Sequence, residues 1–143
     1  MKLATIGYET AALPDVIQRL KAAQVEVVID VRAVASSRKA GFSKTLLAGS
    51  LRDAGVDYVH LQKLGTPKAG RDAARNGQIQ AMHAIFNAHM EEVEPQMQLA
   101  QAIEIARGRK AALLCYEDDH MGCHRSILAD SMVEAAGFEV ENL

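Results

Sequence analysis

Both cysteines of this chain lie in a single twelve-residue segment, CYEDDHMGCHRS at positions 115–126, together with two of the five histidines, three acidic residues and one arginine. A cysteine at the start of a helix meets unpaired backbone N–H groups and the positive end of the helix dipole, which stabilise its thiolate and lower its pKa. The residues that follow favour a helix that begins at or near Cys123. We therefore expect Cys123 to be a nucleophile or acid/base group, with His124 as a proton carrier.

The remaining polar residues of the segment could complete a catalytic site. Glu117 lies three positions after the end of the apolar run AALL and, with Asp30 at the end of another apolar run, could supply carboxylates. Cys115 alternates with its neighbours in a strand, so we expect it to pack in the core or form a wall of the site. We expect both thiols to be reduced and Cys123 to react faster than Cys115.

Zinc binding is the competing interpretation of the same segment. The spacing C-x4-H-x2-C could place Cys115, His120 and Cys123 around one tetrahedral ion. Because His124 directly follows Cys123, these two would rarely reach the same metal, and the spacing is a poor match to known zinc sites. We expect no stoichiometric zinc and no other cofactor, with a zinc-stabilised interaction domain as the alternative.

A phosphatase-like site also combines a strand, a cysteine, a loop, an arginine and a helix. Such a site needs a short loop of backbone amides between the cysteine and the arginine. Nine residues, three of them acidic, separate Cys115 from Arg125, whereas one residue separates Cys123 from Arg125. Neither spacing favours this type of site.

Positive charge is concentrated between residues 32 and 75, a segment that contains nine lysines and arginines and three acidic residues. Most of these cations follow predicted strands. We expect Arg32, Arg38 and Arg125 to converge on one anion-binding pocket, with Tyr8 as part of its wall. The alternatives are that the loops are charged because they are solvated, and that Arg32 forms a fixed ion pair near Asp30.

The elements that must position these residues alternate between strand and helix. Strands are predicted at 2–8, 25–31, 56–61, 110–117 and 138–143, and helices at 13–23, from Ser43 to Gly55, as two helices between 72 and 107 divided at Pro95, and from about Cys123 to Gly137. This alternation predicts a single α/β domain over residues 1–143, with a parallel, Rossmann-like sheet of about five strands and helices on both faces. Ligands of such sheets bind outside the carboxyl ends of the strands.

Composition narrows the class of protein. The chain has 143 residues, 49% of them apolar, and a formal net charge of −2. That charge indicates neither a nucleic-acid-binding nor a membrane-binding protein, and no apolar stretch approaches the roughly 20 residues of a membrane span. Two cysteines are too few for a disulfide framework, and the first residues do not form a signal peptide, so we expect a cytoplasmic protein.

Several short motifs together resemble one family. TIGY, IDVR with SSR shortly after it, YVHLQKLG, and LLCYE followed by CHR are similar to the family known as domain of unknown function 488, over essentially the whole chain. The resemblance implies a compact α/β fold and a shared site, while the family name supplies no reaction. The chain has Ala35, Thr66 and Asn142 where the family pattern has proline, glycine and histidine. The matching positions are Gly7, Tyr8, Asp30, Arg32, Ser37, Arg38, Tyr58, Gly65, Cys115, Glu117, Cys123, His124 and Arg125.

Three functions remain open from the sequence. The first is an enzyme that acts on a phosphate-bearing or nucleotide-like substrate through Cys123. The second is a non-catalytic module that binds a small anion or nucleic acid through the basic segment, and the third is the zinc-stabilised interaction domain. No membrane partner is expected, and no feature of the sequence indicates an oligomeric state.

Overall fold

A five-stranded sheet forms the centre of the computed structural model, which describes residues 1–143 with the exception of the Met121 side chain. Its strands are all parallel and pair in the order β3-β2-β4-β1-β5. They are β1 (Lys2–Gly7), β2 (Val27–Asp30), β3 (Asp57–His60), β4 (Ala111–Cys115) and β5 (Glu139–Asn142). Every residue of β2 and β4 is buried, because both strands are internal and covered on both faces.

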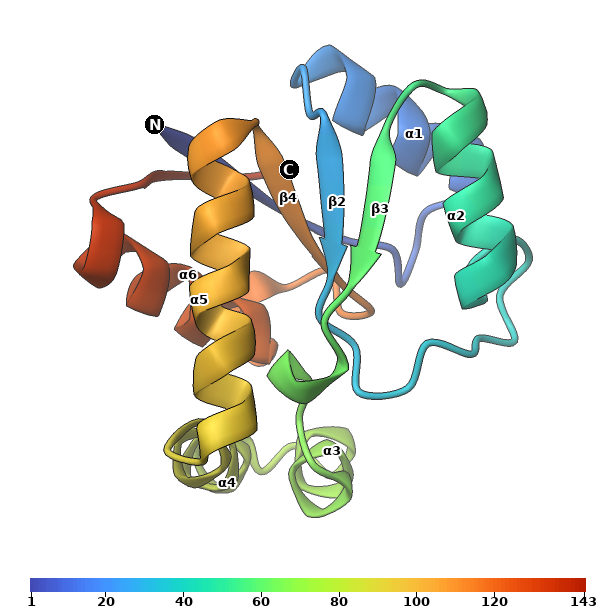
Figure 1. Ribbon diagram of the computed structural model, residues 1–143. Coiled ribbons are helices and arrows are strands. Elements are labelled where there is room, and N and C mark those ends of the chain that lie inside the picture. Colours follow the sequence, from blue (N-terminus) through green and yellow to red (C-terminus); the bar gives the residue numbers. More distant parts are fainter.

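The helices form three groups around this sheet, as Figure 1 shows. One face is covered by α1 (Leu13–Ala22) and α2 (Lys44–Asp53), and the other by α5 (Val93–Gly108) and α6 (His124–Ala136). The third group lies beyond the carboxyl ends of the strands and comprises α3 (Lys68–Arg75) and α4 (Ile79–Met90). Short 3-10 helices at Gln62–Leu64 and His120–Gly122 interrupt two of the loops.

Side chains of each strand alternate between two hydrophobic cores. Ala4 and Ile6 of β1 pack with Leu20 of α1 and Leu51 of α2, whereas Leu3 packs on the opposite side of the sheet. This two-sided burial explains why β-branched and aliphatic residues fill the central strands. The sheet therefore forms a rigid layer, and the loops at its carboxyl edge are the surfaces on which a site can be built.

The predicted fold class is confirmed, and the five predicted strands are present. The prediction of two helices between residues 72 and 107, divided at Pro95, is wrong. Three helices occupy this region, and Pro95 lies in the first turn of α5. Proline is tolerated there because the first-turn N–H groups have no partner within the helix.

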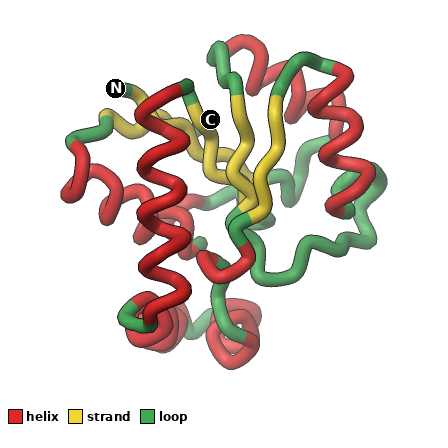
Figure 2. Tube along the Cα trace, in the orientation of Figure 1, coloured by secondary structure: helices red, strands yellow, loops and turns green.

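The loop from residue 31 to residue 43 is the longest connection near the site and runs past the carboxyl ends of the strands (Figure 2). Ser43 occupies the N-cap position of α2, as expected, but its hydroxyl does not cap the helix. Instead it donates to the carbonyl of Ser37 and accepts from the Ser37 N–H, both at 3.1 Å. The hydroxyl therefore stabilises the loop.

Across the described residues, we find no helix that is long and apolar enough to cross a membrane.

Gly7, the last residue of β1, lies against the backbone that follows β4. A Cβ atom there would lie 1.9 Å from the carbonyl oxygen of Glu117, so we expect Gly7→Ala to lower the free energy of unfolding by about 1–3 kcal/mol. Gly108→Ala is the matched control, because a Cβ atom at Gly108 meets no atom within 4 Å. Urea denaturation of both variants measures the difference. Equal stability of the two variants would show that the Gly7 contact does not constrain the fold.

Candidate functional site

A cavity of about 600 Å³ lies at the carboxyl end of the sheet. Its walls come from the loop after β1, the 31–43 loop, α3, α4, the end of β4 and the start of α6. The side chains that could act chemically include Tyr8, Arg38, Cys115, Glu117, Cys123 and His124. The rule that ligands bind outside the carboxyl ends of parallel strands therefore predicted the position of the cavity correctly.

The floor of the cavity carries both cysteines. Cys115 is the last residue of β4, Cys123 is the N-cap of α6, and their sulfur atoms are bonded to each other. The predicted position of Cys123 at a helix start is confirmed. The expectation that both thiols are reduced is wrong for this structure, because the loop after β4 folds back and brings the two sulfurs together. Cys123 can act as a nucleophile only after this bond is reduced.

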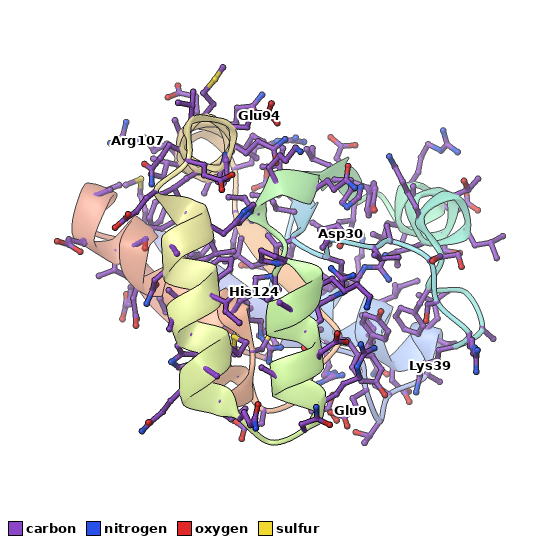
Figure 3. All side chains as sticks on the ribbon, turned by 90° about the horizontal axis from the view of Figure 1, so that it is seen from below. Glu9, Asp30, Lys39, Glu94, Arg107 and His124 are labelled. Carbon is purple, nitrogen blue, oxygen red and sulfur yellow. A yellow bond between two sulfur atoms is a disulfide. The ribbon has the colours of Figure 1, made fainter. Side chains whose placement is uncertain are left out.

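His124 lies beside the two sulfurs. Its Nδ1 is 3.8 Å from Sγ of Cys115 and 3.7 Å from Sγ of Cys123, and its ring packs against Phe86 of α4 with centroids 5.1 Å apart. In Figure 3, which views the molecule from below, His124 lies between α3 and α4. Burial lowers the pKa of His124 to about 4, so the imidazole is neutral at pH 7.

The proton on that neutral ring can be assigned. Nε2 of His124 is 2.8 Å from the carbonyl oxygen of Val31. A carbonyl can only accept, so Nε2 carries the proton and Nδ1 presents its lone pair to the sulfurs.

Glu117 is the carboxylate nearest to the cysteine pair. Its Oε2 is 2.9 Å from Sγ of Cys115, and burial raises its pKa. Glu117 lines the cavity, as its predicted catalytic role requires, whereas Asp30 is not among the lining residues.

The three possible metal ligands that come together differ from the predicted set. In the part of the chain that the structure describes, ligand atoms of Cys115, Cys123 and His124 lie within 4.8 Å of one another, and His120 is not a member of this group. We call these three residues the Cys–His cluster. Cys123 and His124 were expected rarely to reach the same metal because they are adjacent, but here their ligand atoms lie within this distance of each other.

Asp30 and Arg32 form an ion pair beneath the cavity. Arg32 Nε donates to Oδ1 of Asp30 at 2.9 Å and Nη2 donates to Oδ2 at 2.7 Å, with the two side chains 5% and 0% exposed. Nη1 donates to the Tyr8 hydroxyl and to the carbonyl of Phe42, both at 2.8 Å. Burial alone would lower the pKa of Arg32, but the hydrogen bonds and charge of Asp30 raise it. Arg32 thus forms a fixed ion pair with Asp30, which is the alternative to a side chain that is free to bind an anion.

Tyr58 binds the same carboxylate. Its hydroxyl donates to Oδ2 of Asp30, and burial together with this hydrogen bond raises the pKa of Tyr58. The side-chain contacts that the structure describes for Asp30 come from Arg32 and Tyr58, which hold the carboxylate in place.

The predicted convergence of three arginines is correct for two of them. Arg32 and Arg38 line the cavity together with Tyr8. Arg125 is buried, does not line the cavity, and donates from Nη1 to the carbonyl of Glu117 and from Nη2 to that of Asp118. It fixes the path of the loop after β4 by holding these two backbone carbonyls.

Arg71 and Arg75 of α3 also line the cavity, although neither was assigned to the site from the sequence. Arg71 Nη1 donates to the carbonyl of Thr66 at 2.8 Å, and Arg75 forms an ion pair with Asp72. Their spacing of four residues places both on one face of a helix, and this was the available signal. They add positive charge to the cavity that Arg38 also lines.

We expect Arg32→Leu to lower the free energy of unfolding by about 3–5 kcal/mol, because it leaves the buried Asp30 carboxylate without its cation. Arg109→Leu is the matched control, since its ion pair with Asp57 is largely exposed, and we expect a loss below about 1 kcal/mol. Urea unfolding curves at pH 7 measure both values. A loss for Arg32→Leu no larger than that of the control would contradict a structural role for the buried pair.

Comparison with known proteins adds one finding. The model of the family described as Domain of unknown function DUF488 matches residues 12–132. No curated protein and no solved structure matches the chain significantly. The match covers more than half of the 143 residues and includes the 31–43 loop and the Cys–His cluster. The chain therefore belongs to the DUF488 family.

Proposed function

We propose that the protein binds a small anionic ligand, phosphate-bearing or nucleotide-like, in the cavity, and that Cys123 acts on this ligand once the disulfide is reduced. The observation that carries the proposal is that arginines and the Cys–His cluster line one cavity. Positive charge around a reactive group is the arrangement expected for a site that orients an anion against that group.

Arg38 and Arg71 are the side chains best placed to bind the anion. Arg38 lines the cavity from an exposed position on the 31–43 loop. Arg71 is held by Thr66 through one Nη1 bond, which leaves other guanidinium hydrogens for a ligand. Arg75 is partly neutralised by Asp72, so we assign it a smaller contribution.

The dimensions of the site support a small ligand over a nucleic acid. A volume of about 600 Å³ is in the range of pockets for small molecules. Tyr8 and Phe42, the aromatic residues proposed near the loops, stack on each other with centroids 4.2 Å apart and are 3% and 0% exposed. They are therefore not free to stack on bases, which single-strand binding would require. The non-catalytic nucleic-acid module is thus the weaker proposal.

Reduction by an external dithiol would supply two electrons and two protons and convert the disulfide to two thiols. Cys123 lies at the amino end of α6, whose dipole stabilises a thiolate, whereas Cys115 lies 2.9 Å from the Glu117 carboxyl group. Nδ1 of the neutral His124 would take the proton of Cys123 as the sulfur attacks phosphorus of the ligand. An S–P bond would form as the P–O bond to the leaving group breaks, and the leaving oxygen would take up that proton. We propose the cytoplasm as the compartment, where protein disulfides are usually transient.

We expect inorganic pyrophosphate, used as the probe, to bind the protein, and Arg38→Ala and Arg71→Ala each to weaken binding by about tenfold or more. A hydrogen bond to a charged group contributes about 1.5–3 kcal/mol, which corresponds to such a loss. Isothermal titration calorimetry of the metal-free protein at low and moderate salt measures it.

Arg109→Ala is the control for this experiment, because Arg109 pairs with Asp57 at the amino end of β3 and does not line the cavity. The same affinity in Arg38→Ala, Arg71→Ala and Arg109→Ala, or no binding by the wild type, would refute the anion site.

After reduction in the presence of a chelator, we expect iodoacetamide to modify Cys123 faster than Cys115. Cys115 and Cys123 both line the cavity and are similarly buried, so we expect the difference to report thiolate stabilisation by α6. Rates at neutral pH in Cys115→Ser and Cys123→Ser, each of which retains one thiol, measure the ratio. If the thiol retained in Cys123→Ser, which is Cys115, reacts faster, Cys123 is not the nucleophile.

A further inference from the structure

We propose that the reduced Cys–His cluster is a zinc site in which Sγ of Cys115, Sγ of Cys123 and Nδ1 of His124 bind one Zn²⁺ and leave a fourth position open to the cavity. The proposal goes beyond anion binding and does not depend on it. Thiolates and imidazole are the ligands that zinc prefers in proteins.

The distances within the cluster suit a tetrahedral ion. Zn–S bonds of about 2.3 Å and Zn–N bonds of about 2.0 Å at a tetrahedral angle place sulfur and nitrogen ligands about 3.5 Å apart. The structure has Nδ1 of His124 at 3.8 Å and 3.7 Å from the two sulfurs. The nitrogen is therefore already at coordination spacing, and breaking the S–S bond frees the two sulfurs to separate around the ion.

The imidazole is also correctly oriented. Its Nε2 donates to the carbonyl of Val31 at 2.8 Å, so the lone pair of Nδ1 points to the sulfurs. Histidines that bind metals usually donate their second ring N–H to a carbonyl or carboxylate in this way, which fixes the ring and its tautomer. The contact between His124 and Phe86 further restricts rotation of the ring.

The location of the cluster indicates an open site rather than a closed structural one. All three side chains are buried, and all three line the cavity of about 600 Å³. Three protein ligands with a fourth position facing a cavity are typical of catalytic zinc sites, whereas structural sites use four protein ligands. An anion that enters past Arg38 would reach that fourth position.

Metal binding and the disulfide exclude each other. Reduction of the bond between Cys115 and Cys123 by a dithiol consumes two electrons and two protons and yields two thiols. Zn²⁺ then displaces one proton from each thiol, and both protons go to solvent. The metal occupies the thiolate that would otherwise serve as the nucleophile, so Cys123 has one role or the other in a given molecule.

The test uses Co²⁺ as a spectroscopic probe, added to the full-length, metal-free protein after reduction with a phosphine and without any anionic ligand. We expect one equivalent to produce thiolate-to-cobalt charge-transfer absorption and the visible bands of a tetrahedral site, and Zn²⁺ to displace it. The oxidised protein should give neither signal, a comparison that needs no variant.

Cys115→Ser, Cys123→Ser and His124→Gln should each weaken cobalt binding by roughly tenfold or more. His120→Gln is the matched control and should bind as the wild type, because His120 is outside the cluster. Circular dichroism of each variant reports whether it is folded. A reduced wild type without the cobalt spectrum, or equal affinity in His124→Gln and His120→Gln, would overturn the proposal. Pyrophosphate binding to the metal-free protein is a separate measurement, so either proposal can fail while the other holds.

Discussion

The buried ion pair between Asp30 and Arg32 is the interaction on which the site depends. It lies where β2 ends, and it gathers Tyr8 from the loop after β1, Tyr58 from β3 and the Phe42 carbonyl from the 31–43 loop. An unpaired charge in this position would be costly, so each partner requires the other and both require their hydrogen bonds. Segments far apart in the sequence are thereby fixed around one point at the carboxyl edge of the sheet.

The same strand end also orients the reactive groups. Val31 lies between the two charged residues, and its carbonyl accepts a hydrogen bond from His124 Nε2. The adjacent Arg32 carbonyl lies 2.8 Å from Nε2 of His60. Because the ion pair holds this backbone in place, it determines indirectly where the lone pair of His124 Nδ1 points. A buried charge pair beneath the cavity thus sets the geometry of the Cys–His cluster.

Sequence patterns within single helices and strands predicted much of this structure. The predictions that proved wrong concern contacts between these elements. Apolar strands, helix boundaries and the parallel-sheet rule placed Arg38 and Cys123 at one cavity. The pairing of Cys115 with Cys123 depends on the path of the loop between them, which Arg125 fixes through backbone carbonyls that no residue pattern reveals. Cys123 and His124, although adjacent in the sequence, come close enough to share a metal for a local reason. Cys123 has extended dihedrals, φ −126° and ψ 145°, whereas His124 begins α6, so neighbouring side chains can turn to one point.

The oxidation state of the two sulfurs determines the electrostatic field that an incoming anion meets. With the disulfide formed, the sulfurs carry no charge, and among the described lining residues four arginines outnumber two acidic residues, Glu9 and Glu117. Reduction to a thiolate adds negative charge to the floor, which opposes the anion unless the proton moves to Nδ1 of His124. A divalent metal on the Cys–His cluster reverses this effect, since two positive charges offset both thiolates and attract an anion to the open position. Because ligand affinity and redox state are linked in this way, an anion that binds more tightly to the oxidised form must also make the disulfide harder to reduce by the same free energy.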